Sequence, residues 1–161
     1  REGTPVDPFT GTPAARPARC DAAGSLARSL WRDPAQQGLD AYEPVVIYRA
    51  GLATGRPDSA RARYEGYPTE ATVSAGALVG YVVLLGAAGG TTVDTAITGP
   101  NGAVVFENSA EVPRDFARYF SFAGTPRPGS GWPPGVYDAR FVVTTPDSGY
   151  RIEATARIVL R

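Results

Sequence analysis

The sequence contains no histidine and no lysine, and it has a single cysteine. Without histidine, a Ser-His-Asp or Cys-His catalytic site is impossible within this chain, and the commonest zinc ligand is missing. One cysteine can form neither an internal disulfide nor a thiolate cluster for a metal. No run of 18 apolar residues occurs, so we expect no membrane span. We therefore predict no catalytic, metal or cofactor site in this chain.

Sixteen arginines balance sixteen acidic residues, which gives a formal net charge of zero. The arginines are scattered along the chain, so we expect no nucleic-acid partner, and we interpret the missing lysine as codon bias. No spacing singles out a catalytic pair of carboxylates. Glu107 and Glu111 flank a predicted loop, and we interpret them as solvated surface acids.

The first 41 residues differ in character from the rest. Residues 1–11, REGTPVDPFTG, lack the basic and apolar regions of a signal peptide. Residues 12–41 are rich in Ala, Pro, Arg and Gly, which predicts a linker with one short helix that Asp21 caps. Trp31 on this helix is expected to pack against a neighbouring domain. Two interpretations of Cys20 stay open, a disulfide partner in another segment and an unpaired thiol.

From residue 42 onward the pattern is that of short strands. Residues 136–144 (VYDARFVVT) and 150–160 (YRIEATARIVL) alternate apolar and polar side chains, which predicts strands with one buried face. Residues 44–51 and 115–124 are also strand-like. The apolar run 77–86 predicts a strand buried on both faces.

Turn signals connect these strands. We expect 91–99 to be the antiparallel neighbour of 77–86 across an AAGG turn. A type I turn at 99–102 (GPNG) predicts a hairpin with 103–107. The polar stretch 56–66 is expected to contain one helical turn that Pro57 starts.

Seven or so short strands in about 120 residues predict an all-β fold, an immunoglobulin-like antiparallel β-sandwich. The N-terminal linker with its short helix would precede this sandwich. We expect three regions, namely a remnant of a preceding domain at 1–11, the linker at 12–41 and the sandwich at 42–161.

Three aromatic residues are candidates for ligand contact: Trp132, Tyr64 and Tyr67. Trp132 lies in GSGWPPGVYDARF, where two prolines and a glycine approach a strand, and it would close one end of the core as a lid. The alternative is an exposed ring that stacks on a sugar. Carbohydrate binding through the three residues requires rings that are exposed and roughly coplanar.

Several segments together resemble the region that follows the catalytic domain in bacterial zinc metallopeptidases of the lysostaphin/LytM type. In chain order they are PVVIYRAGLATGRPD, ALVGYVVLLGAAGGTTVDTAITGPNGAVVFE, RYFSFAG and GWPPGVYDARFVV. The opening REGTPVDPFTG is similar to the residues after the H-x-H strand of those enzymes, so we expect the chain to start there. The resemblance implies zinc in the missing catalytic domain, held by an H-x-x-x-D motif and the second His of H-x-H. No ligand maps onto a chain without histidine.

The resemblance implies a non-catalytic C-terminal accessory domain of a periplasmic or extracellular cell-wall endopeptidase. Its expected partners are the preceding peptidase domain and peptidoglycan, which it would help to position. The alternative hypothesis is a free-standing immunoglobulin-like adhesion or protein-interaction module, because the fold alone does not choose among functions. An H-x-x-x-D segment encoded upstream of Arg1 would favour the peptidase.

Overall fold

The computed structural model describes residues 44–146 and 149–161. The predictions for 1–11 and 12–41, including those for Asp21, Trp31 and Cys20, lie outside the described residues. From Val45 to Arg161 the chain forms one compact unit.

All but one of the elements of the compact unit are strands. In chain order its elements are β1 (Val46–Ala53), α2 (Ser59–Tyr64), β2 (Glu70–Ala71), β3 (Ala77–Ala87), β4 (Thr92–Thr98), β5 (Val104–Glu111), β6 (Phe116–Pro126), β7 (Gly135–Thr144) and β8 (Arg151–Leu160). The apolar periodicity of 136–144 and 150–160 thus corresponds to β7 and β8, and the two-sided apolar run corresponds to β3.

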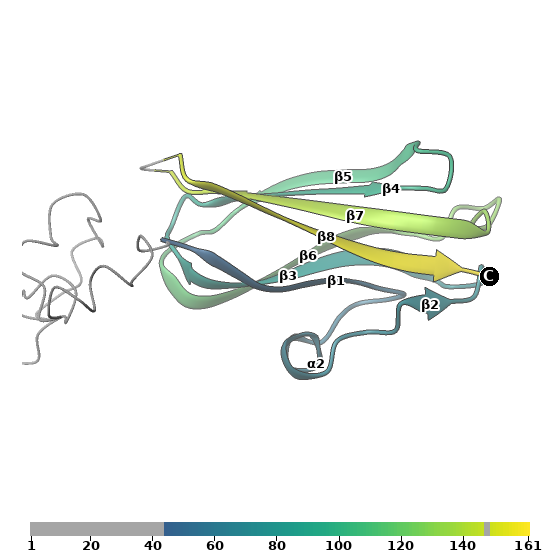
Figure 1. The fold of residues 1–161 in the computed structure, drawn as a ribbon, viewed down its shortest axis with the longest axis horizontal. Helices are drawn as coiled ribbons and strands as arrows, with labels where there is room; N and C mark the ends of the chain where they lie inside the picture. The colour runs from purple at the N-terminus through teal and green to yellow at the C-terminus, as the bar shows by residue number, and fades with distance from the viewer. Residues whose placement is uncertain (1–43, 147–148) are drawn as a thin grey trace, which may run out of the picture. The chain divides into compact units, whose positions relative to one another are not determined.

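The strands form two sheets that lie face to face (Figure 1). One sheet has the order β1-β3-β6, and the other has the order β2-β8-β7-β4-β5. Apart from β2, which pairs with β8 in parallel over two residues, neighbouring strands are antiparallel. The first, second and fifth long strands lie in one layer and the other four long strands in the second. The fourth long strand, β5, therefore pairs with β4, whereas a constant-type immunoglobulin domain places its fourth strand beside the fifth. The predicted β-sandwich is confirmed.

The predicted pairing of 91–99 with 77–86 is wrong, because β3 and β4 belong to different sheets. Both edges of β3 are occupied by β1 and β6, and both edges of β4 by β5 and β7. The connection between them crosses from one sheet to the other. There the Gly90 N–H donates to the Val112 carbonyl at 2.8 Å, and the Val112 N–H donates to the Thr91 carbonyl at 2.8 Å.

The hairpin of β4 and β5 is confirmed, with Ile97 opposite Phe106. In its turn the Gly102 N–H donates to the Gly99 carbonyl at 2.9 Å, and Gly102 adopts φ 76°, which glycine tolerates without strain. The register places Glu107 and Glu111 on β5 itself and not beside a loop, since the strand continues to Glu111. Both side chains are exposed, as expected of surface acids.

The helical turn in 56–66 is confirmed as α2, but Pro57 does not start it. Asp58 is the N-cap, and its carboxylate accepts a hydrogen bond from the Arg61 N–H at 2.8 Å. A short polar side chain at this position satisfies a backbone donor that the helix leaves unpaired. Pro57 precedes the cap and is buried.

The main core lies between the two sheets. Alternate residues of β7 point into it, so that Tyr137, Ala139, Phe141 and Val143 are all fully buried. Because the side-chain period of a strand is two, the residues between them face outward from the five-stranded sheet. In antibody domains an inter-sheet disulfide crosses this core, and the corresponding position two residues after the tyrosine is Ala139 here.

Tyr137 forms the tyrosine corner that is typical of immunoglobulin-like sandwiches. Its hydroxyl donates to the Pro133 carbonyl at 2.9 Å, four residues upstream. Burial raises the pKa of Tyr137, so the hydroxyl keeps the proton that this bond needs at neutral pH. The bond holds the Pro133–Pro134 segment against the start of β7.

We expect Tyr137→Phe to lower the free energy of unfolding by about 0.5–1.5 kcal/mol, because the hydrogen bond to the Pro133 carbonyl is lost while the ring stays in place. Urea denaturation followed by far-ultraviolet circular dichroism measures this change. The control is Tyr48→Phe, since Tyr48 is 51% exposed, and we expect a change within about 0.5 kcal/mol. Equal stability of the two variants would contradict a structural role for the corner.

Candidate functional site

Trp132 lies inside the protein, at the edge of the main core. The indole is 5% exposed, its Nε1–H donates to the Ala75 carbonyl at 2.8 Å, and its ring meets that of Tyr137 edge to face at 5.8 Å. This position agrees with the interpretation of Trp132 as a lid on the core. Stacking on a sugar requires an open ring face, which an indole buried to this extent does not offer.

Tyr67 lies outside the main core, on the outer face of the three-stranded sheet. Its ring packs edge to face against Tyr81 at 5.4 Å, and its hydroxyl accepts the Asp58 N–H at 2.6 Å. The guanidinium carbon of Arg61 lies over the same ring, 4.7 Å from its centroid. Tyr67 therefore holds the cap of α2 against the sheet, and it is half-buried.

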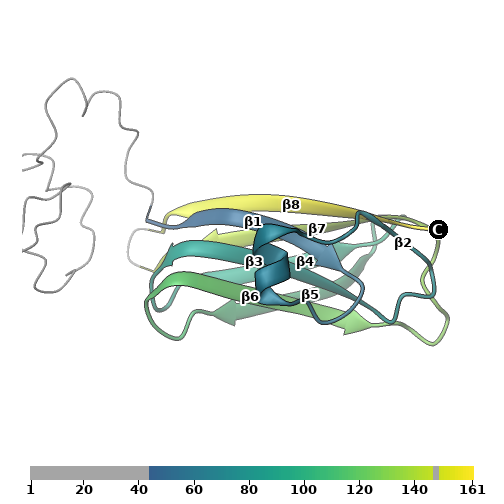
Figure 2. The ribbon, with the colours of Figure 1, turned by 90° about the horizontal axis from the view of Figure 1, so that it is seen from below.

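Tyr64 is the most exposed of the three candidates, at 64%. It ends α2, which lies across the outer face of β1, β3 and β6 (Figure 2). Ala62 on the same helix is fully buried against Tyr81 and Val83. The structure thus places Tyr64 and Tyr67 in the segment that covers this sheet, whereas Trp132 belongs to the core between the sheets.

Further residues join Tyr64 on this surface, which we call the arginine–aromatic face. Phe120 and Phe122 on β6 stack with ring centroids 5.6 Å apart, and Phe122 is 40% exposed. Guanidinium groups cap the rings, with Arg56 5.6 Å from Phe122 and Arg63 4.0 Å from Tyr64. The face consists of Arg56, Arg61, Arg63, Tyr64, Tyr67, Arg118, Phe120 and Phe122.

Positive charge on the arginine–aromatic face is largely uncompensated. Arg61 is 3.9 Å from Glu65, but within residues 44–146 and 149–161 no carboxylate lies within 4.0 Å of Arg56, Arg63 or Arg118. Guanidinium groups beside aromatic rings are weakly hydrated and readily form paired hydrogen bonds with carboxylates. The face is therefore complementary to an acidic ligand with apolar parts.

The outer face of the five-stranded sheet has the opposite character, because its arginines are paired. Arg157 makes two bonds to Asp138, at 2.7 and 3.1 Å. Glu153 accepts from Arg140 at 2.7 Å and pairs with Arg151 at 2.6 Å. The hydrogen bond from Arg140 is the main reason why the pKa of Glu153 is lowered.

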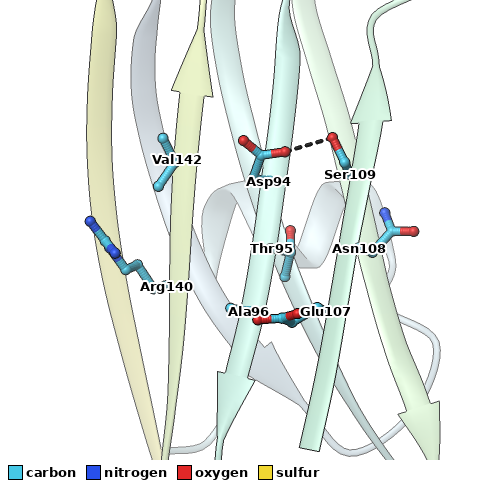
Figure 3. Close-up of a pocket in the computed structure, with 8 residues that line it drawn as sticks. All are labelled: Asp94, Thr95, Ala96, Glu107, Asn108, Ser109, Arg140 and Val142. Atoms are coloured by element: carbon cyan, nitrogen blue, oxygen red, sulfur yellow. Dashed lines mark hydrogen bonds between the residues drawn. The ribbon is translucent and has the colours of Figure 1, made fainter. Parts of the chain in front are cut away.

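A shallow groove of about 490 Å³ crosses β4 on the same outer face (Figure 3). The Ser109 hydroxyl donates to the Asp94 carboxylate there at 2.6 Å, and Arg140 lines the groove with its guanidinium extending toward β8. Glu107 lines the groove together with Val142. No three Asp, Glu or Cys side chains of the described part of the chain are grouped so as to hold a metal ion.

Part of the arginine–aromatic face was readable in the sequence. In RYFSFAG, alternation places Arg118, Phe120 and Phe122 on one side of a strand. We expected a strand at 115–124 but did not predict which of its side chains face solvent. Exposure of Phe122 follows from the position of β6 at the edge of its sheet, which no local pattern indicates.

Comparisons with known proteins supply no family for this chain. No protein-family model matches it, and no curated protein matches it. Among solved structures, a β-glucuronidase from Parabacteroides merdae is similar at a TM-score of 0.42 and 12% sequence identity. The match covers 73% of this chain and only 14% of the glucuronidase chain. A likeness this distant carries no argument about activity.

In the described ranges no helix has the length and apolar character to cross a membrane.

We expect Gly51→Ala to destabilise the packing of Tyr81 on the outer face of the three-stranded sheet. A Cβ at Gly51 would overlap the ring of Tyr81, which lies across β1 there. Overpacking of this kind costs about 1–3 kcal/mol of unfolding free energy, and the near-ultraviolet circular dichroism of the tyrosines should change with it. The matched control is Gly55→Ala, where a Cβ meets no atom within 4 Å. Equal losses of unfolding free energy in the two variants would contradict the close approach of the Tyr81 ring to Gly51.

We expect Arg140→Gln to raise the pKa of the Glu153 carboxyl toward its ordinary value of 4.5. In the folded protein this pKa is lowered, so the stabilisation is present above the unfolded pKa and is lost as the pH falls through the folded one. Carbon-detected NMR of the carboxyl during an acid titration measures the midpoint. Arg157→Gln is the control, since Arg157 bonds to Asp138, and an unchanged Glu153 midpoint in both variants would contradict the pairing.

Proposed function

We propose that this chain is a non-catalytic binding module, the C-terminal accessory domain of a cell-wall zinc endopeptidase. Its role would be to position the enzyme on peptidoglycan or to regulate access to the substrate. The observation that carries the binding role is the arginine–aromatic face, where exposed rings lie beside Arg56 and Arg63, which have no acidic partner among residues 44–146 and 149–161. Bond cleavage would belong to the preceding peptidase domain.

The chemistry of the face supports recognition of an acidic polymer. Tyrosine, phenylalanine and arginine are enriched where proteins bind partners, because they contribute large contact areas and directional donors. Peptidoglycan offers both sugar rings and peptides with free carboxylates. Phe122 and Tyr64 would contact apolar parts of such a ligand, and the uncompensated arginines would attract its negative charge.

The cell-wall context rests on the resemblance of the segments at 44–58, 77–107, 118–124 and 131–143 to lysostaphin/LytM-type proteins. By that resemblance, zinc would be held in a separate catalytic domain, since the residues of this chain include no histidine to supply. The location would then be periplasmic or extracellular. An H-x-x-x-D segment encoded before Arg1 would support this context, and an unrelated upstream domain would contradict it.

A second candidate function is that of a free-standing adhesion or protein-interaction module. The same face favours it, because exposed aromatic residues with arginines are typical of protein interfaces as well. The two candidates differ in the partner, so a binding assay with purified peptidoglycan separates them.

We expect the chain to co-sediment with purified peptidoglycan and, with added zinc, to release no soluble peptide from it. The double variant Tyr64→Ser/Phe122→Ser should reduce the bound fraction about fivefold or more, because exposed aromatic anchors dominate such contacts. The control is Val104→Ser on β5, where an apolar side chain is 54% exposed on the other sheet.

Three outcomes would contradict the proposal. Equal binding of peptidoglycan by the double variant and the control would show that the arginine–aromatic face does not contact it. Hydrolysis of peptidoglycan by this chain alone would overturn its non-catalytic role. Absence of sedimentation by the unaltered chain would favour the protein-interaction module.

A further inference from the structure

A small pocket lies between α2 and β6, inside the arginine–aromatic face. Its volume is about 170 Å³. The helix contributes one side, with Ser59, Arg63 and Tyr64, and β6 contributes Arg118 and Phe120. Because α2 is anchored through Tyr67 and Ala62, the two sides of the pocket have a fixed spacing.

Two cations line the pocket from different elements. Arg118 projects from an exposed position on β6, and Arg63 from the last turn of α2, where its guanidinium lies 4.0 Å from the Tyr64 ring centre. Neither has a carboxylate within ion-pair distance among the residues that the structure describes. Two guanidinium groups without a protein counter-ion favour an anion from outside.

Val83 and Phe120 form an apolar part of the lining. Val83 is 1% exposed and belongs to the same buried cluster that Phe120 packs against. A phosphate ion, which is polar on every side, would leave this apolar surface unused. A carboxylate on a short hydrocarbon stem would place its oxygens at the arginines and its stem against Val83 and Phe120. At roughly 30 Å³ for each water-sized group, the volume fits about six non-hydrogen atoms.

We infer that this pocket binds a carboxylate carried on a short aliphatic stem, as found at the C-terminus or an acidic side chain of a peptide. The inference deepens the proposed function and rests on it for the biological source of the ligand. The pocket chemistry itself is independent of peptidoglycan. Arg118 and Arg63 hold the carboxylate, and Val83 and Phe120 contact the stem.

The test uses the full chain, labelled with ¹⁵N, and three small probes: sodium butyrate, butyramide and inorganic phosphate. Butyrate has the predicted size and charge, and butyramide is its neutral counterpart. We expect saturable shifts of the side-chain Nε–Hε signals of Arg63 and Arg118 with butyrate. Butyramide and phosphate should bind about tenfold more weakly, since one lacks the charge and the other the stem.

Matched arginine variants locate the site. Arg118→Gln should weaken butyrate binding about tenfold, whereas Arg151→Gln, on the other sheet, should change it less than about twofold. Arg118 and Arg151 are both exposed, so the dispersed spectrum of each variant should show an intact fold. Acetyl-trialanine with a free C-terminus, its C-terminal amide, and the same amide with a terminal glutamate then distinguish the two carboxylate sources.

Several results would overturn the inference. Phosphate binding as tightly as butyrate would show a general anion site, and unsaturable shifts would show no site. Equal weakening by Arg118→Gln and Arg151→Gln would place the binding elsewhere. Butyrate binding at Arg118 without sedimentation on peptidoglycan would support the pocket while contradicting the cell-wall partner, so the two proposals fail separately.

Discussion

Burial of β3 on both faces is the constraint on which the arrangement of this sandwich depends. Leu78, Val82 and Leu84 point into the core between the sheets, while Tyr81 and Val83 point outward. Leaving each outward side chain in water would forfeit about 1.5–3 kcal/mol. The segment after β1 therefore folds back over the sheet as α2, and this cover also brings Arg63 and Tyr64 beside β6.

The two outer faces of the sandwich show how differently the same residue type can be used. On the five-stranded sheet, arginines pair with Asp138 and Glu153 across neighbouring strands. Exposed pairs of this kind add little to stability, but they cancel charge that could attract a ligand. On the three-stranded sheet the arginines lie over aromatic rings instead. A chain with no net charge thus still presents one face with a positive surplus.

Much of the fold could be predicted because it depends on local periodicity. The alternation in β7 and β8, the two-sided apolar run of β3 and the turn at 99–102 all correspond to observed elements. The partner of β4 could not be predicted, because a glycine-rich connection serves a hairpin and a crossing between sheets equally well. The exposure of Trp132 was likewise undecided, since its burial depends on Ala75, 57 residues away in the chain.

By itself, the sequence determined where strands form and which chemistry this chain lacks. Side-chain alternation and the absence of histidine are properties of single segments or of composition, so no tertiary contact can alter them. Only the tertiary structure decided which rings remain exposed and which arginines have acidic partners. Burial and charge pairing depend on contacts between segments that are distant in the chain, such as α2 and β6.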